Sequence, residues 1–522
     1  MLASKESSTG MNPLPKRYPL LAYLISIGKT AIIFFLFFLA VDLKATVHQT
    51  YPLYVGTSSI DITPTLPAAL DGQMQVRIAE VVETPLTANV VVMETRDGDR
   101  TISVTTWVSC DLVTIPTELL DLIRHSVGKR LPSLDPAKII VNATHTHTAG
   151  VVRDGWYLIP EGVTQVKEYQ EFIAAQVANA IENAWAEREK ASVSWGLDYA
   201  KVAYNRRAVY ADGRAQMYGK VDVPDFRRIE GVEDQSIQSL FFWNNSGRLI
   251  ATCINVSSPA QVVESRSVVN ADYWHPVREA LKTEFGKDLV VLGWIGAAGD
   301  QSPRPMYDNR AENRMLELGA GDEESNYRQN EVDFRTDAYS QEIARRIVAA
   351  VLKTHDVVKD DRNQEVLLEH RVARIELPMR TVTKAEVEDA KKMRDEDVNN
   401  PEKAKHFSRR IAWQQEVVDR FERQRTDPAP TYPSEIHVMR IGDLAICTNP
   451  FELFTDFGIQ IKSRSKALQT VVIQLVGPGT YVPTQEAVSG GHYSAIVQSN
   501  RVGPVGGQML VESTVSMIDD LF

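Results

Sequence analysis

Hydrophobic positions form two kinds of run that alternate from about residue 50 onward. The shorter runs are rich in β-branched and aromatic residues and predict strands, at residues 87–95, 101–110, 138–147, 236–244 and 249–257. The longer runs have apolar residues at helical spacing and predict helices, at residues 117–131, 169–189 and 337–353. Strands that alternate with helices are typical of a mixed α/β fold, in which helices pack on a sheet.

Residues 47–522 are predicted to form one large domain. Between Tyr51 and Phe522 the sequence has no Gly/Ser-rich linker, no low-complexity tract and no internal repeat. Within this span, residues 383–425 are highly charged and contain proline only at Pro401. We expect them to form a helical insertion of two surface helices, with charges that face solvent rather than a partner.

The amino terminus has the features of an export signal. Lys16 and Arg17 precede an apolar stretch at 18–27, and Lys29 precedes a denser one, AIIFFLFFLAV, at 31–41. The denser stretch has the length of a signal-peptide core, so residues 1–46 are predicted to be a cleaved signal peptide. The alternative joins both stretches into one membrane anchor. Both interpretations predict an exported protein that is periplasmic, extracellular or anchored to the outer face of a membrane.

Charge and cysteine content narrow the classes of function. Lys and Arg number 57 against 68 Asp and Glu, and this net charge of −11 argues against a nucleic-acid partner. Cys110, Cys253 and Cys447 are far apart in the sequence and form no CxxC pair. A disulfide framework or a cysteine-based zinc site is therefore not expected.

The strongest local signal for chemistry is the segment NATHTHTAG at 142–150, which ends a β-branched run and enters a glycine loop. His145 and His147 are two residues apart, so on a strand both would project to the same side. Such a pair can offer two imidazoles to one metal, or one to a metal and one to a substrate. A hydrogen-bonded pair of core histidines is the alternative.

A series of motifs in this order resembles the neutral ceramidase family (neutral/alkaline non-lysosomal ceramidases). The resemblance covers about residues 54 to 510 and rests on the ordered set rather than on any single motif. The motifs are VGTSSIDITP at 55–64, TPL at 84–86, VSCDL at 108–112, NATHTHTAG at 142–150, NRR at 205–207, GDQSP at 299–303, RIGDLA at 440–445, PFELFT at 450–455, TYVPT at 480–484 and GGH at 490–492.

This resemblance implies an exported, zinc-dependent hydrolase of sphingolipid metabolism, which cleaves the N-acyl amide bond of a ceramide-like lipid. By their positions in the motifs, His145, Glu452 and Tyr481 resemble zinc ligands of the family. Zinc lowers the pKa of a bound water toward ~7 and polarises the amide carbonyl. Three protein ligands and a water form an acceptable catalytic zinc shell.

Three further residues resemble the rest of the family's active site. His147 resembles an imidazole that handles protons, Arg206 a contact for the substrate or the oxyanion, and Ser302 a polar active-site residue. A base next to the activated water and an arginine near the developing oxyanion make a coherent mechanism for amide hydrolysis.

The sequence also departs from the family pattern. Ser258 stands where the family has its remaining zinc histidine, and His275, seventeen residues downstream, is a candidate to replace it. Residues 487–489 (AVS) lack an active-site tyrosine of the family. Because the sequence ends soon after Gly491, we do not expect the family's C-terminal β-sandwich. The fold expected is thus a single ceramidase-like catalytic domain with a helical insertion.

These departures keep three functions open. The first is a hydrolase of a lipid or other small-molecule amide, with possible membrane association through the amino-terminal segment. The second is a catalytically impaired relative that binds a lipid or glycan. The third is a hydrolase of an ester or a carbohydrate derivative, since a fold does not determine its substrate.

Overall fold

Two β-sheets pack face to face at the centre of the structure, which is a computed structural model that describes residues 49–319 and 333–522. The larger sheet has nine strands in the order β14-β13-β12-β7-β1-β4-β5-β6, with β16 beside β1. Its strands are β1 (Tyr51–Asp61), β4 (Thr87–Asp97), β5 (Arg100–Cys110), β6 (Ile139–Ala143), β7 (Glu189–Tyr199), β12 (Ser236–Asn244), β13 (Leu249–Val256), β14 (Val290–Ile295) and β16 (Glu365–Val366).

The smaller sheet has four strands in the order β17-β18-β19-β21. These strands are β17 (Leu368–Pro378), β18 (Thr431–Ile441), β19 (Leu444–Thr448) and β21 (Gln469–Ile473). Short strands at the ends and edges are β2 (Ala68–Leu70), β3 (Arg77–Ala79), β8 (Tyr204–Asn205), β9 (Arg207–Tyr210), β10 (Ala215–Met217), β11 (Phe226–Ile229), β15 (Gln301–Ser302), β20 (Glu452–Leu453) and β22 (Tyr481–Val482).

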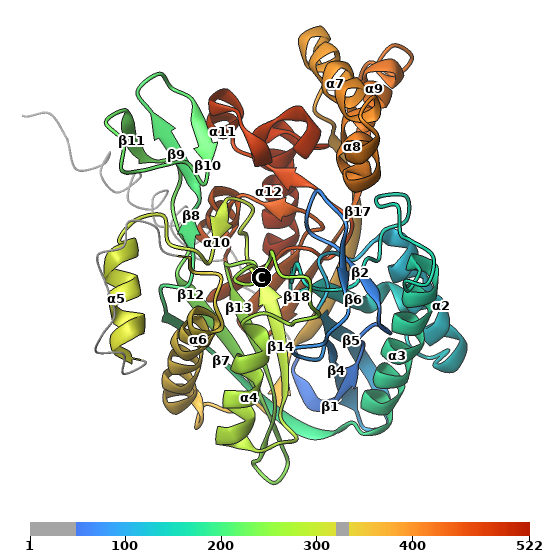
Figure 1. Cartoon of the computed structure of the whole chain (residues 1–522). Helices are drawn as coiled ribbons and strands as arrows, with labels where there is room; N and C mark the ends of the chain where they lie inside the picture. Colours follow the sequence, from blue (N-terminus) through green and yellow to red (C-terminus); the bar gives the residue numbers. More distant parts are fainter. Residues whose placement is uncertain (1–48, 320–332) are drawn as a thin grey trace, which may run out of the picture. The chain divides into compact units, whose positions relative to one another are not determined.

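Helices cover the outer faces of both sheets. The large sheet carries α2 and α3 over β4–β6 and α4 and α6 over β12–β14, while α10 and α12 cover the small sheet (Figure 1). The α-helices are α2 (Thr117–Arg130), α3 (Val166–Ala186), α4 (Trp274–Phe285), α5 (Asn309–Gly319), α6 (Asp337–Val358), α7 (Lys384–Val398), α8 (Pro401–His406), α9 (Ser408–Arg423), α10 (Thr455–Arg464), α11 (Gln485–Gly490) and α12 (Pro504–Asp519). Single 3-10 turns are η1 (Pro136–Lys138), η2 (Tyr493–Ala495) and η3 (Val497–Ser499).

The alternation of side chains along each strand explains this layered packing. In β4, Val90 and Val92 face the helices, while Val91 and Met93 face the second sheet, where they share a core with Met439 of β18. Successive side chains on a strand point to opposite faces, and both faces here are buried, so the strands are almost continuously apolar. The mixed α/β fold expected from the sequence is confirmed.

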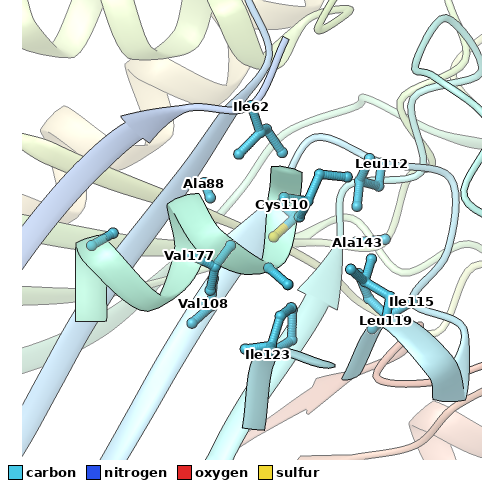
Figure 2. Packing of buried hydrophobic residues seen from close by; sticks show 14 of the residues in the cluster. Ile62, Ala88, Val108, Cys110, Leu112, Ile115, Leu119, Ile123, Ala143 and Val177 are labelled. Carbon is cyan, nitrogen blue, oxygen red and sulfur yellow. The ribbon is translucent and has the colours of Figure 1, made fainter. Parts of the chain in front are cut away.

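The core beneath α2 and α3 lies next to the end of β6. Figure 2 shows Val177 of α3 and Ile123 of α2 among side chains of β5 and β6, including Cys110 and Ala143. Burial raises the pKa of the Cys110 thiol, and all three cysteines are buried and unpaired. This packing supports the loops that follow β5 and β6.

The charged insertion forms three helices, α7, α8 and α9, rather than the two expected. Pro401 starts α8, and the side chain of Asn400 caps it by accepting from the amide of Lys403. One charge of the insertion turns inward, because Nη1 of Arg409 donates to the Tyr157 hydroxyl at 2.6 Å. After β22 the chain continues through α11 and α12 to Phe522.

The predicted signal peptide or anchor at 1–46 lies outside the described residues. In the ranges that the structure describes, no helix is long and apolar enough to cross a membrane. Residues from Thr50 to Phe522 form one compact unit.

Candidate active site

His145 and His147 lie in the loop that follows β6. The sequence pattern predicted a strand through both residues, and this is wrong: β6 ends at Ala143, and His145 has a positive φ of 65°. The amide of His145 donates to the carbonyl of Leu112 at 2.8 Å, which turns the chain away from the strand. The two imidazole rings still meet edge to face, with Nε2 atoms 3.3 Å apart. A positive φ at a residue other than glycine is strained, and such strain clusters at functional sites.

The two nitrogens of the His145 ring have different partners. Its Nδ1 lies 2.7 Å from the carbonyl oxygen of Val113, and its Nε2 lies 3.4 Å from Oε2 of Glu452. A carbonyl only accepts, so Nδ1 donates to Val113 and Nε2 is the nitrogen that points toward Glu452. This is how a histidine that binds a metal through Nε2 is usually oriented.

Glu452 and Tyr481 lie opposite each other on two short parallel strands, β20 and β22. Their side chains are hydrogen-bonded to each other. Gly299 packs on the backbone of β20 so closely that a Cβ there would lie 2.3 Å from the Glu452 carbonyl oxygen. A side chain at position 299 would therefore displace the strand that positions the Glu452 carboxylate.

Arg206 lies buried between β8 and β9 and points into the same site. Its Nη2 donates to the Gly299 carbonyl at 2.9 Å and to the Tyr481 hydroxyl at 3.2 Å. Its Nη1 lies 3.2 Å from the Tyr218 hydroxyl, which in turn lies 3.1 Å from Oγ of Ser302. Ser302 thus reaches the site through Tyr218 and Arg206.

Ser258 and His275 do not contribute to this group of side chains. Oγ of Ser258 donates to the carbonyl of Val202 at 3.1 Å, and so turns away from His145 and Glu452. His275 lies half-buried near the start of α4, where burial lowers its pKa and Glu279 has the largest effect among the neighbouring charges. A replacement of the family's histidine by His275 has no support in these contacts.

Burial and close charges set the protonation of the site. Burial alone would raise the pKa of the Glu452 carboxyl, but the His145 ring and the Tyr481 hydroxyl hold it below its usual value. Burial and the Glu452 carboxylate raise the pKa of Tyr481 well above its usual value. Burial and the His145 ring hold the pKa of His147 well below its usual value. At neutral pH the site therefore contains a carboxylate, a neutral tyrosine and a neutral His147 beside the Arg206 guanidinium.

The donor atoms fit a zinc ion only if tyrosine is one of the ligands. Within residues 49–319 and 333–522, no three side chains of the types His, Cys, Asp and Glu are grouped so that they could hold a metal. His145, Glu452 and Tyr481 supply one imidazole nitrogen and two oxygens, and Glu452 contacts both of the others. One nitrogen and two oxygens suit Zn²⁺ in a site with three protein ligands. The fit therefore depends on the third ligand, Tyr481.

Several residues of the site were not predicted from the sequence. Gln261 contacts both Arg206 and His147, and Glu264 lies 3.5 Å from Nδ1 of His147. The Tyr493 ring packs edge to face on Tyr481, with centroids 5.8 Å apart. A tyrosine thus lies next to Tyr481 even though residues 487–489 contain none. The sequence gives no local signal for these residues, because folding alone brings them to the site.

Comparison with solved structures finds a similar fold in two proteins named as ceramidases. The chain is similar to the neutral ceramidase from Pseudomonas aeruginosa, with a TM-score of 0.63 and 15% identity over 90% of this chain and 75% of that chain. It is also similar to a ceramidase complexed with C2, with a TM-score of 0.60 and the same identity and coverage. No protein-family model and no curated protein matches the sequence. At this identity the likeness confirms the expected fold.

Proposed function

We propose that the chain is a zinc-dependent hydrolase of amide bonds. The observation that carries this proposal is the mutual contact of His145, Glu452 and Tyr481 in a buried site beside the Arg206 guanidinium. The likeness in fold to two structures named as ceramidases supports an N-acyl amide as the bond that is cleaved. We leave the amide's acyl chain and head group open, so the substrate class includes lipids and other small molecules.

The roles of the chain's residues follow from their donors and acceptors. Zinc held by His145, Glu452 and Tyr481 would supply a water of lowered pKa and polarise a carbonyl. Nε2 of His147 is placed to take a proton next to that point, because the ring is neutral and 3.3 Å from His145. The Arg206 guanidinium would donate to the oxygen on which negative charge develops.

A cavity of about 1140 Å³ connects to the site through two of its lining residues, although no proposed zinc ligand or catalytic side chain lines it. Its lining includes Trp156, Tyr157, Tyr432 and Thr480. The first connection is Thr480, which precedes Tyr481 in the chain. The second is Tyr157, whose hydroxyl donates to Asp71, and the Asp71 carboxylate is one of the charges that act on the His147 ring. This mixed aromatic and polar wall supports an amide with an apolar portion as the substrate.

The proposed function is tested by following amine release from a panel of N-acyl lipids and other N-acyl amides. The wild type is expected to release amine, and His145→Ala is expected to lose this activity by at least about 10²-fold. His406→Ala is the matched control, since His406 is exposed at the end of α8. Its described ion pair is with Glu402, which lies in the same helix. Equal activity of wild type and His145→Ala would contradict the proposal.

One observation favours a second candidate, a protein that binds a lipid or glycan without cleaving it. Ser258 bonds to the Val202 carbonyl instead of facing the site, so a ligand of the family pattern is missing. Binding of an N-acyl lipid by the wild type without any turnover would support this candidate. Turnover of esters or N-acetyl sugars, but not of other amides, would instead identify a different hydrolase.

We further propose that the protein acts outside the cytoplasm. Support comes from the apolar stretch AIIFFLFFLAV at 31–41, which follows basic residues. Detection of the mature chain in the culture medium or periplasm, with a new amino terminus near residue 46, would support cleavage. Recovery of the uncut chain in membranes would support the anchor.

A further inference from the structure

Arg409, in the first turn of α9, carries a positive charge from the insertion into the wall of the site. Its Nη1 donates to the Tyr157 hydroxyl at 2.6 Å and to the Gln73 carbonyl at 3.0 Å. The amide of Leu158 donates to Oγ of Ser408 at 3.0 Å, which ties the helix start to the loop that holds Tyr157. A cation in the first turn lies at the positive end of the helix dipole, where it is unfavourable. An anion near Arg409 is therefore needed to offset this repulsion.

Asp71 supplies one such anion, but two arginines share it. Nε and Nη2 of Arg153 donate to the two carboxylate oxygens of Asp71 at 3.2 and 2.9 Å, and Nη1 of Arg409 lies 3.3 Å from Oδ1. Burial alone would raise the pKa of Asp71, but Arg153 and Arg409 hold it well below its usual value, so the residue is a carboxylate. One carboxylate balances one guanidinium, and one positive charge is left in excess.

The surroundings do not supply a second anion. Among the ion pairs of the described residues, neither of these two arginines has a carboxylate partner other than Asp71. Arg77 adds a third buried guanidinium nearby, and its Nη1 and Nη2 donate only to backbone carbonyls. The Glu264 carboxylate pairs with Arg304 at 2.7 Å. This side of the site is therefore positively charged.

Donors on Arg153 and Arg409 are unused. The hydrogen bonds of Arg153 come from Nε and Nη2, so its Nη1 has no partner in the part of the chain that the structure describes, and neither has the buried Nε of Arg409. Arg153, Trp156 and Tyr157 line the cavity of about 1140 Å³. Both guanidinium groups pack on the Trp156 ring, at 3.8 and 4.8 Å from its centroid. Stacking holds their planar donors in place, in the geometry that carboxylates bind.

The two arginines lie close to the residues proposed for the reaction. The Arg409 charge acts on the His147 ring and on Tyr493, whose own ring packs on Tyr481. An anion bound to Arg409 and Arg153 would thus lie a short distance from the amide being cleaved. In an N-acyl amino acid the carboxylate is separated from the amide nitrogen by a single carbon, which suits this arrangement.

We propose that Arg153 and Arg409 form a subsite for an anionic group on the amine part of the substrate, a carboxylate as in an N-acyl amino acid. The excess positive charge, the unused donors and the adjoining cavity favour such an amide over one with a neutral head group. The class of substrate rests on the proposed amide hydrolysis, whereas the affinity for a carboxylate does not.

The subsite is tested by isothermal titration calorimetry of the chelated full chain with N-octanoylglycine and with the neutral N-octanoylglycinamide. Chelation prevents turnover and keeps the carboxylate from binding a metal instead. The wild type is expected to bind the carboxylate at least about tenfold more tightly, and Arg409→Met to show less than about a threefold preference. Equal affinities in the wild type, or no measurable binding of the carboxylate, would overturn the proposal.

Three further variants separate the lost charge from a lost structure. Arg409→Lys keeps the charge and is expected to retain more than about a threefold preference. Arg425→Met is the matched control in the insertion, since Arg425 is exposed and pairs with Glu422. Its preference should equal that of the wild type. If melting curves show that Arg409→Met does not fold, Arg153→Met removes the other guanidinium and is expected to lose the preference. A preference that survives in the folded variant, or is lost in Arg425→Met, would overturn the subsite.

Turnover by the zinc-loaded full chain separates this proposal from the proposed function. The ratio of kcat/KM for N-octanoylglycine to that for N-octanoylglycinamide is expected to be at least about tenfold in the wild type and to fall in Arg409→Met. Preferential binding of the carboxylate with no turnover of either amide would contradict the proposed function alone. Turnover of both amides with equal kcat/KM and equal affinities would overturn the subsite alone.

Discussion

Arg206 brings a positive charge into the site, and its described contacts are to carbonyl, hydroxyl and amide oxygens. These partners accept from Nη1 and Nη2 without neutralising the charge, while the buried Nε has no hydrogen-bond partner among the described residues. The guanidinium is therefore available to a developing negative charge on a substrate, at a strength that a solvated arginine would not reach.

Replacement of Arg206 by methionine is expected to lower kcat for amide hydrolysis by about 10²–10³-fold, which is typical for the loss of one oxyanion donor. Arg214→Met is a matched control, since Arg214 is exposed and pairs with Asp212 and Asp225. Steady-state kinetics of both variants measure this change in kcat. A kcat for Arg206→Met close to that of Arg214→Met would show that the guanidinium does not act on the reaction.

A second prediction at the scale of residues concerns stability in acid. Burial and the neighbouring His437 lower the pKa of His370 to about 2, while hydrogen bonds to His437 and Arg124 outweigh burial and lower that of Glu435 to about 2. The usual values of these two types of group are 6.5 and 4.5, so the unfolded chain binds protons first. The stability from these groups is therefore fully present above about pH 6.5 and is lost as the pH falls, first through His370 and below about 4.5 through Glu435.

This prediction is checked by measuring Tm between about pH 8 and pH 4, roughly the range in which histidines titrate in unfolded chains. The wild type is expected to lose several degrees as the pH falls. His370→Gln should lose less between about pH 6.5 and 4.5, because it no longer takes up a proton on unfolding. If Tm fell equally with pH in the wild type and in His370→Gln, His370 would not contribute to the loss of stability in acid.

At the scale of elements, a buried ion pair joins α4 to the strand end that supports the site. Nη1 and Nη2 of Arg278 donate to the two carboxylate oxygens of Asp111 at 2.7 and 2.9 Å. Oδ1 of Asp111 also accepts from the Thr144 hydroxyl at 3.1 Å, next to His145. The pair therefore links the loop after β5 to the loop that carries His145.

Arg278→Met would leave the Asp111 carboxylate buried without its cation. The free energy of unfolding is expected to fall by about 3–5 kcal/mol, the usual effect of breaking a buried pair. Urea unfolding measures it, and Arg464→Met is the control because its partner Glu512 lies on the surface. If both variants unfolded at similar urea concentrations, the ion pair would not be a support of this region.

The elements show where sequence patterns succeed and where they fail. The runs at 87–95 and 101–110 are β4 and β5, because buried β-branched residues repeat along them. The run at 138–147 ends as a strand at Ala143, since the amide of His145 bonds to the Leu112 carbonyl rather than to a neighbouring strand. That bond joins residues far apart in the sequence, so periodicity could not predict it.

For the whole molecule, the class of fold could be predicted but the pairing of the strands could not. The packing of two sheets arises from contacts between distant segments such as β4 and β18, which no local pattern records. The ordered motifs indicated His145, Glu452 and Tyr481, and the structure brings these three together. Gln261 and Glu264 could not be predicted, because their place in the site depends on contacts with the His147 ring that only the folded chain creates.

The central claim is that this group of side chains holds zinc and uses it to cleave an amide. The most direct test follows amine release from an N-acyl amide while zinc is returned to the chelated full chain. We predict that turnover appears with zinc and saturates at about one ion per chain, and that His145→Ala shows neither zinc uptake nor turnover. Turnover that is indifferent to chelation and to His145→Ala would contradict it.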